Sequence, residues 1–389
     1  MRLLLAFLLA LPAFAGYGYS VAVTIDNAQV GGATLTDYPA MVCANGPSSG
    51  SCDATAHTNL AIANLKSTGN GGKVTSTSGY DIGLFSDANC TASLSYELEY
   101  YSPTTGWLVM WVNISSLSHS VDTVIYLCYE NAAITTNQST TATWASKYLL
   151  VGHYPDGTTL SYADSTSNAR TGVPNTMSGT PSAPAALAGI ADGAASWDTG
   201  VDVYALYSGT GLPTGTGSRT ISVWYKAPNV CSAASNQYIW MTGSFPTNNQ
   251  FVGLRTGGTG LFIEAIGING TAGLSPAFTI SCNTWYHFAF TFNSSGTVAK
   301  LYANGVEIDS GTFASANTGS ASFSVGASGN PAIFNGSCGC YTDEVRFTNS
   351  VETTSLLAEY NNVSSPWTFY TFGGETPLGG RIRHRVTQQ

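Results

Sequence analysis

The chain has 389 residues and a formal net charge of −9; 9% of its residues are charged, 43% are hydrophobic and 12% are aromatic. The apolar content excludes a disordered chain, and the acidic balance excludes nucleic acid as an expected partner, because phosphate backbones are attracted by positive charge. The length favours two domains.

The first 15 residues have the features of a secretory signal peptide. Arg2 precedes an apolar run, Leu3–Leu11, and Ala13–Ala15 (AFA) supplies a cleavage site of the small-residue type. The run is too short to span a membrane, which takes about 18 apolar residues. We therefore expect a mature protein that begins at Gly16, is secreted to the extracellular space or the cell surface, and has no transmembrane segment.

Short runs of β-branched and aromatic residues follow, separated by clusters of Gly, Asn, Ser and Pro, and such runs are typical of strands. In chain order they are Ser20–Asp26, Tyr96–Tyr101, Trp107–Ile114, Thr123–Tyr129, Thr220–Ala227, Leu261–Gly267, Trp285–Phe292, Ala299–Ala303 and Asp343–Thr348. Only Thr55–Leu65 and Thr353–Tyr360 favour short helices. The pattern predicts an all-β protein built as two antiparallel β-sandwich domains in tandem.

The domain boundaries are predicted from composition. Residues 132–143 (AAITTNQSTTAT) are rich in Thr and lack an apolar period, which favours a linker. This places a first sandwich at 16–131 and a second at 144–375, after the signal peptide at 1–15. Residues 376–389 contain several basic side chains, and we expect a solvated basic tail or, alternatively, an attachment to an acidic envelope surface.

All eight cysteines lie in the mature chain, four in each half: Cys43, Cys52, Cys90 and Cys128, then Cys231, Cys282, Cys338 and Cys340. An exported protein favours disulfides, and we expect them within each half and none between the halves. Three pairings are open in each half; in the first we favour Cys43 with Cys52 and Cys90 with Cys128. A bridge between Cys338 and Cys340 is expected to be strained, and no zinc-like ligand spacing surrounds that pair.

The second half contains two long motifs. The first, Asn283–Thr312 (NTWYHFAFTFNSSGTVAKLYANGVEIDSGT), contains strands with alternating side chains and includes Asn304-Gly305, a type I′ hairpin signal. The second, Tyr341–Asn362 (YTDEVRFTNSVETTSLLAEYNN), ends in a predicted helix. Together with HYPDG at 153–157 and TISVWYKAP at 220–228, they resemble the laminin-G-like branch of the concanavalin-A-like lectin/glucanase superfamily over about residues 144–375. The resemblance implies a jelly roll.

The first half is similar to an uncharacterised secreted bacterial domain of unknown function that commonly precedes such lectin domains. The matching segments are VTIDNAQ at 23–29, SGYDIGLFSD at 78–87, LSYELEYY at 94–101, MWVNISSLS at 110–118 and IYLCYEN at 125–131. Glu130 replaces the glycine usual in the last motif, which puts only a local turn in doubt. This resemblance implies a fold and no activity.

The glycosidases of the superfamily carry E-x-D-x-x-E, in which two glutamates act on one glycosidic bond. Glu307 and Asp309 begin this motif, but Thr312 stands where the second glutamate would fall. One carboxylate cannot act as both acid and nucleophile, so the motif predicts no catalysis. We therefore expect that the protein is not an enzyme.

Other polar residues are candidates for catalysis or metal binding, and each also has a simple structural interpretation. The histidines show no metal-binding spacing: His57, His119, His153, His287 and His384. Glu97 and Glu99 share one strand face and resemble an acid pair, although solvation of an exposed face is the favoured interpretation. His287, and His153 with Asp156, are interpreted as structural.

Glycan recognition is expected to use aromatic side chains beside Asn-rich loops of the second domain, because sugar C–H faces stack on rings and hydroxyls bind amides. The candidates are Trp197, Tyr204, Tyr207, Trp240, Asn248 and Asn249.

Calcium is the candidate cofactor, because many lectin-like sandwiches hold their loops to the sheet through a calcium ion that is bound by oxygen ligands. Its candidate ligands are Asp156, Asp164, Asn168 and Asp343. The alternative for Asp343 is an ion pair with Arg346 or a turn cap.

Three functions remain open from the sequence. The favoured one is a non-catalytic carbohydrate-binding or adhesion protein whose partner is a polysaccharide or cell-surface glycan. The second is a structural component of a cell envelope or appendage that binds no glycan. The third is a glycan-active hydrolase in the first domain that uses Glu97 or Glu99.

Overall fold

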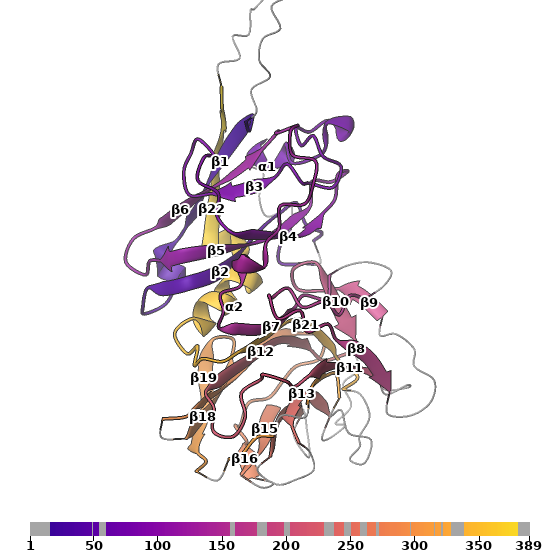
Figure 1. Cartoon of the computed structure of the whole chain (residues 1–389), viewed down its shortest axis with the longest axis vertical. Helices are drawn as coiled ribbons and strands as arrows, with labels where there is room; N and C mark the ends of the chain where they lie inside the picture. The colour runs from indigo at the N-terminus through magenta and orange to yellow at the C-terminus, as the bar shows by residue number, and fades with distance from the viewer. Residues whose placement is uncertain are drawn as a thin grey trace, which may run out of the picture.

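The computed structural model describes residues 16–48, 50–53, 60–155, 160–176, 185–197, 203–228, 237–244, 250–256, 263–269, 272–295, 297–314, 316–319, 322–327 and 338–379. Over these residues the chain is built from antiparallel strands joined by turns and short helices, which confirms the all-β fold class (Figure 1). The strands form two domains, one above the other in the view of Figure 1.

The first domain contains two small sheets. One has the order β22 (Tyr370–Pro377), β1 (Tyr19–Ile25), β6 (Thr123–Tyr129) and β3 (Gly83–Phe85), and the other has the order β2 (Leu35–Ala44), β5 (Leu108–Leu117) and β4 (Tyr96–Tyr101). Alternate residues of each strand point into the shared core, because side chains along a strand alternate between faces. Val21, Val23, Val42 and Val112 are examples, each at most 1% exposed.

The second domain is a larger sandwich of two sheets. The first has the order β19 (Val306–Thr312), β18 (Val298–Ala303), β17 (Trp285–Asn293), β12 (Arg219–Lys226), β21 (Tyr341–Thr348), β10 (Gly193–Ser196) and β9 (Ala185–Ala188), with β7 (Tyr148–Gly152) also paired to β21. The second has the order β16 (Ala272–Leu274), β15 (Ile263–Asn269), β14 (Phe251–Thr256), β13 (Tyr238–Gly243), β20 (Ser322–Val325), β11 (Val203–Ser208) and β8 (Val173–Thr176).

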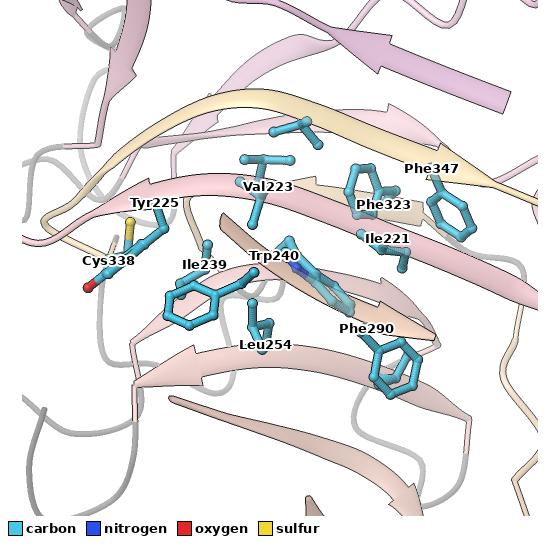
Figure 2. Packing of buried hydrophobic residues seen from close by; sticks show 14 of the residues in the cluster. Ile221, Val223, Tyr225, Ile239, Trp240, Leu254, Phe290, Phe323, Cys338 and Phe347 are labelled. Atoms are coloured by element: carbon cyan, nitrogen blue, oxygen red, sulfur yellow. The ribbon is translucent and has the colours of Figure 1, made fainter. Parts of the chain in front are cut away.

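Large side chains from both sheets fill the space between them (Figure 2). Ile221 and Val223 of β12 face Trp240 of β13 and Leu254 of β14, and all of them are buried. The predicted hairpin joins β18 to β19: Asn304 and Gly305 have φ values of 52° and 79°, as a type I′ turn requires.

Helices are short and few among the described residues. They comprise α1 (Leu60–Ala63), α2 (Leu356–Ser364), α3 (Pro366–Phe369) and the 3₁₀ turns Asn27–Gln29, Thr68–Asn70 and Thr141–Thr143. The expected helix at 353–360 corresponds to α2, and the described part of the one expected at 55–65 to α1. No helix in the described ranges has the length and apolarity that a membrane crossing requires.

The last strand lies outside the domain to which the sequence analysis assigned it. β22 pairs with β1, with Tyr19 opposite Pro377 and Ile25 opposite Tyr370, so residues 370–377 complete the first sandwich. Tyr370 is buried in that domain, where its hydroxyl hydrogen-bonds the backbone of Cys43. The expected boundary at residue 375 therefore differs from the structure, because the chain returns to the first domain after α3.

Disulfides Cys43–Cys52 and Cys90–Cys128 form as expected, with Cα separations of 5.8 and 6.3 Å. Cys338 and Cys340 are also bridged, at a Cα separation of 5.0 Å, within the range that a disulfide spans. Cys282 is disulfide-bonded as well, whereas Cys231 lies outside the described residues.

Candidate functional site

The aromatic residues expected to bind sugar lie in the interior. Trp197 and Trp240 are 0% exposed, and Tyr204 and Tyr207 are 4% and 1% exposed. Trp197 Nε1 donates to Thr342 Oγ1 at 2.7 Å, which fixes this ring inside the sandwich. The expectation that these rings contact a ligand is therefore wrong, because a large sandwich core needs such side chains itself. Asn248 and Asn249 lie outside the described residues.

The candidate calcium ligands already serve as hydrogen-bond partners. Asp164 accepts from the backbone N–H groups of Val151, Thr166 and Arg170 at 2.8–3.1 Å. Asp343 accepts from two backbone N–H groups, and Asn168 donates to the carbonyl of Tyr148. Calcium takes six to eight converging oxygens, and calcium binding by these residues stays a prediction. Asp156 lies outside the described residues.

The junction between the domains is formed by the outer face of the β2-β5-β4 sheet. Met41 and Trp111 on this face are fully buried in one cluster with Trp144, Trp224 and Val363 of the second domain. Asn362 of α2 exchanges two hydrogen bonds with the backbone of Met41, at 2.6 and 2.9 Å. The two domains therefore share an interior.

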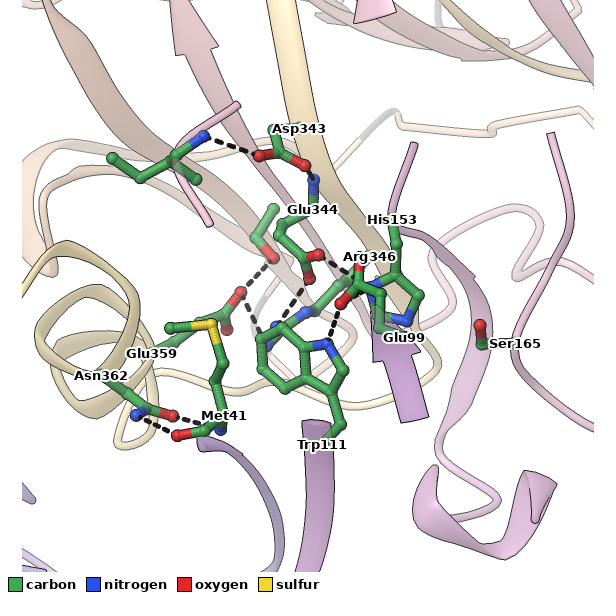
Figure 3. Close-up of polar contacts among 12 residues, drawn as sticks. Met41, Glu99, Trp111, His153, Ser165, Asp343, Glu344, Arg346, Glu359 and Asn362 are labelled. Carbon is green, nitrogen blue, oxygen red and sulfur yellow. Dashed lines mark hydrogen bonds and ion pairs between the residues drawn. The ribbon is translucent and has the colours of Figure 1, made fainter. Parts of the chain in front are cut away.

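Charged side chains lie within this interior (Figure 3). We call them the junction cluster: Glu97 and Glu99 of β4, His153 after β7, Glu344 and Arg346 of β21, and Glu359 of α2. Figure 3 labels all of them except Glu97. Segments that lie far apart in the chain thus meet at one place.

His153 is surrounded by carboxylates. Its Nδ1 lies 2.7 Å from Glu344 Oε1 and 3.5 Å from Glu99 Oε2, and its Nε2 lies 3.5 Å from Glu97 Oε2. The side chains of Glu344 and Glu99 are 0% and 2% exposed. Bulk solvent therefore contributes little to screening these charges.

Arg346 links the cluster to α2. Its Nη2 donates to Glu344 Oε2 at 3.1 Å, and its Nη1 lies 3.3 Å from Glu359 Oε1. The guanidinium carbon also lies 4.5 Å from the centre of the Trp111 ring, a cation–π distance.

Burial and neighbouring charges together shift the pKa values of several groups at the junction. Burial alone would lower the pKa of His153, but Glu344, Glu99 and Glu97 together raise it well above its usual value. Burial, followed by the charge of Asp192, raises the pKa of Glu99 well above its usual value. Burial also raises the pKa of Asp192 to about 7.

Glu97 and Glu99 are therefore not an exposed acid pair, and the favoured interpretation of a solvated face is wrong. Their oxygens accept from the indole nitrogens of Trp144 at 2.6 Å and Trp111 at 2.5 Å, respectively. Both carboxylates therefore take part in the contact between the two domains. Strand alternation predicts their shared face, but not the domain that covers it.

The second domain also carries an aromatic ladder on the outer face of its larger sheet, formed by Trp285, Lys226 and Tyr341. Lys226 lies opposite Trp285 on β17 and Tyr341 on β21. Its ammonium is 4.9 Å from the Trp285 ring and 4.8 Å from the Tyr341 ring. All three side chains are only partly buried, and Trp285 also packs against the buried cluster at the domain junction, so it is the remaining exposed part of this surface that can contact a ligand.

The first domain has a hollow of about 480 Å³ beside the loop that precedes β5. Trp107 forms part of its wall, packed on Tyr100 at a ring distance of 4.4 Å. The polar lining comes from Asn45, Lys66 and Thr104. This is a second partly exposed aromatic surface, in the other domain.

The incomplete glycosidase motif lies on β19, next to β18. Glu307 pairs with Lys300 at 2.7 Å, and Asp309 accepts from the backbone N–H of Ser275 at 2.9 Å. Thr312 ends the strand.

Comparison with known proteins confirms both resemblances. The family described as the concanavalin A-like lectin/glucanases superfamily matches residues 198–355, and a domain of unknown function, DUF2341, matches residues 78–166. The second match extends beyond the predicted linker at 132–143 and includes Glu97, Glu99 and His153. One family match therefore includes residues of the junction cluster on both sides of the predicted linker.

Several solved structures are similar to part of the chain. Domain 4 of AbnA, a GH43 extracellular arabinanase from Geobacillus stearothermophilus in complex with arabinotriose, is 21% identical, with a TM-score of 0.44, over 55% of this chain and 98% of that one. The binding domain of Paraclostridial Mosquitocidal Protein 1 is 12% identical (TM-score 0.41; 55% and 52%), and that of botulinum neurotoxin serotype D is 13% identical (TM-score 0.39; 55% and 50%). No curated protein matches the chain.

Proposed function

We propose that the protein is a non-catalytic, extracellular carbohydrate-binding protein that holds a polysaccharide against the aromatic ladder of its second domain. The observation that carries this proposal is the partly exposed row of Trp285, Lys226 and Tyr341 on a lectin-like sheet. The family match over residues 198–355 supports a binding role for this domain.

The chemistry of the ladder suits a sugar chain. The C–H faces of pyranose and furanose rings pack on aromatic rings, and an ammonium group between two rings can donate to hydroxyls or to a carboxylate of an acidic sugar. The two rings lie on β17 and β21, on either side of β12, so they are separated by two strand spacings of about 4.8 Å each. A sugar chain can therefore run across these strands over Trp285, Lys226 and Tyr341.

The extracellular location is supported by the three described disulfides, because disulfides persist in oxidising compartments. The non-catalytic assignment is supported by the positions of the carboxylates. Glu307 is ion-paired at the surface, whereas Glu99 and Glu344 are closed inside the junction. Glu307 lacks the second glutamate of the motif, and Glu99 and Glu344 lack the open setting that a glycosidase acid and its partner share.

Affinity electrophoresis of the mature chain through gels that contain single polysaccharides tests the proposal. We expect at least one neutral or weakly acidic polysaccharide to retard the protein. Trp285→Ala should weaken this retention by roughly 5- to 150-fold, the effect of truncating a binding hot spot worth about 1–3 kcal/mol. The variant should stay folded with at most a modest fall in unfolding temperature, because Trp285 is partly buried and packs against the cluster at the junction.

Trp107→Ala is the matched control, because it removes a partly buried tryptophan from the hollow of the first domain. It should leave retention unchanged. The proposal is wrong if no polysaccharide retards the folded chain, a result that favours the structural-component alternative. Loss of retention in Trp107→Ala alone would also contradict it.

A further inference from the structure

The junction contains three side chains with the donor types of a metal site. Glu99, His153 and Glu344 each offer one ligand atom, and these atoms lie within 4.8 Å of one another. The three residues come from β4, from the chain after β7 and from β21, so the group exists only when the two domains are packed together. Its formation is therefore a property of the whole fold.

Unpartnered polar atoms point to a missing ligand at this place. Glu99 Oε1 and Asp192 Oδ2 are buried and have no donor group as a partner, and the two carboxyl groups face each other, although buried polar atoms normally pair with a donor. His153 Nε2 faces Glu97 Oε2 at 3.5 Å, which leaves Nδ1, on the side of Glu99 and Glu344, as the nitrogen that can ligate a metal ion. The side chains of Glu99, Asp192 and His153 are each at least nine-tenths buried.

Negative groups are in excess around the three residues. The described carboxylates are Glu97, Glu99, Asp192, Asp343, Glu344 and Glu359, whereas the described cationic candidates are Arg346, His153 and His287. Arg346 is already engaged by Glu344 Oε2 and Glu359 Oε1. Buried charge of one sign is costly unless it is compensated, and a divalent cation compensates it at one point.

We propose that the junction binds one divalent transition-metal ion of the zinc class, ligated by Glu99, His153 and Glu344. One imidazole nitrogen and two carboxylate oxygens are ligands that Zn²⁺ accepts, with a water molecule in the fourth position. Calcium is disfavoured, because it takes six to eight oxygens and little nitrogen. Neither domain alone supplies the full ligand set.

The distances need only a small adjustment. Ligand atoms of a tetrahedral zinc ion at about 2.0–2.1 Å from the metal lie roughly 3.3 Å apart. The separation of His153 Nδ1 from Glu99 Oε2 is 3.5 Å, and its separation from Glu344 Oε1 is 2.7 Å. Glu344 uses its other oxygen for Arg346, which holds the ligating oxygen toward the histidine.

Metal content after refolding tests this site. The mature chain without an affinity tag is unfolded with its disulfides intact, stripped with a chelator, refolded with or without Zn²⁺, and freed of loose metal by gel filtration. We expect one tightly held zinc per chain and a raised unfolding temperature in the zinc-refolded sample. Refolding with Co²⁺ should give the visible absorption bands of a tetrahedral cobalt site.

Glu99→Gln should abolish stoichiometric binding, and Glu97→Gln is the matched control from the same strand face that should retain it. A natively refolded chain that takes up neither zinc nor cobalt overturns the proposal. Equal metal content in Glu99→Gln and in the native chain overturns it as well. If Glu99→Gln does not fold, the cobalt spectrum of the native chain alone decides: tetrahedral bands support the site and their absence excludes it.

Discussion

Glu359 is the residue through which α2 is held electrostatically to the larger sheet of the second domain. Its Oε1 accepts from Ser222 at 2.8 Å and lies 3.1 Å from His287 Nε2 and 3.3 Å from Arg346 Nη1. Burial alone would raise the pKa of Glu359, but Arg346 and His287 lower it to about 2. A carboxyl whose pKa is depressed by folding stabilises the folded state above its unfolded pKa.

This stabilisation should disappear in acid. Between about pH 4.5, the ordinary glutamate value, and pH 2, the free energy of unfolding should fall by roughly 3 kcal/mol more in the native chain than in Glu359→Gln. Urea unfolding at stepped pH measures the difference. Glu307→Gln, which alters an exposed ion pair, serves as the control and should follow the native chain. Parallel pH profiles for the native chain and Glu359→Gln would disprove the role of this ion pair.

Trp240 belongs to the core rather than to a binding surface. Its ring packs near Phe290 and Phe323, at centroid distances of 6.0 and 6.3 Å. Trp240→Ala should therefore lower the free energy of unfolding by about 3–5 kcal/mol, the usual cost of emptying such a site. Chemical denaturation checks this. A variant of native stability with lost glycan binding would instead restore Trp240 as a contact residue.

At the scale of elements, β22 is the strand with the largest structural consequence. It covers one edge of β1 and brings Tyr370 and Phe372 into the core of the first domain. Deleting the chain after Phe369 removes both aromatic side chains, each worth about 1.5–3 kcal/mol when buried, and leaves an open strand edge.

We expect this deletion to yield a destabilised protein that aggregates or is cleaved in the first domain, as measured by thermal unfolding and limited proteolysis. A chain that ends at Leu378 is the control, because it keeps the pairing of β22 with β1 and the hydrogen bond from Leu378 to Gly18. Equal stability of the two truncated chains would show that β22 is dispensable.

The sequence predicts well those strands whose alternation and flanking turns are encoded in neighbouring residues. The expected Thr220–Ala227 and Trp285–Phe292 correspond to β12 (Arg219–Lys226) and β17 (Trp285–Asn293), because alternation and flanking turns mark both ends. β22 was not predicted. Gly373, Gly374 and Pro377 indicate the end of a domain rather than a strand, and β1, the partner strand, lies near the other end of the chain. Pairing over such a separation leaves no local signal.

At the scale of the whole molecule, the two domains are coupled by a shared interior. Trp111 and Met41 of the first domain are buried by the second, and β22 crosses back in the opposite direction. Sequence patterns identify each domain but not the partner of each face. The continuous apolar run Leu108–Val112 of β5 is consistent with a strand covered on both faces, yet it does not say which element covers the outer one. The junction cluster could therefore not be predicted as a whole, although Glu97, Glu99 and His153 are each individual candidates in the sequence.

The central claim is that the lectin-like domain binds carbohydrate through the aromatic ladder. Hydrogen–deuterium exchange of the mature chain, with and without the polysaccharide that retards it most, tests this directly. We predict slower exchange in the backbone around Lys226, Trp285 and Tyr341 when the polysaccharide is bound, with no change around the hollow at Trp107. Protection confined to the hollow, or no protection in the second domain at saturating polysaccharide, would contradict the account.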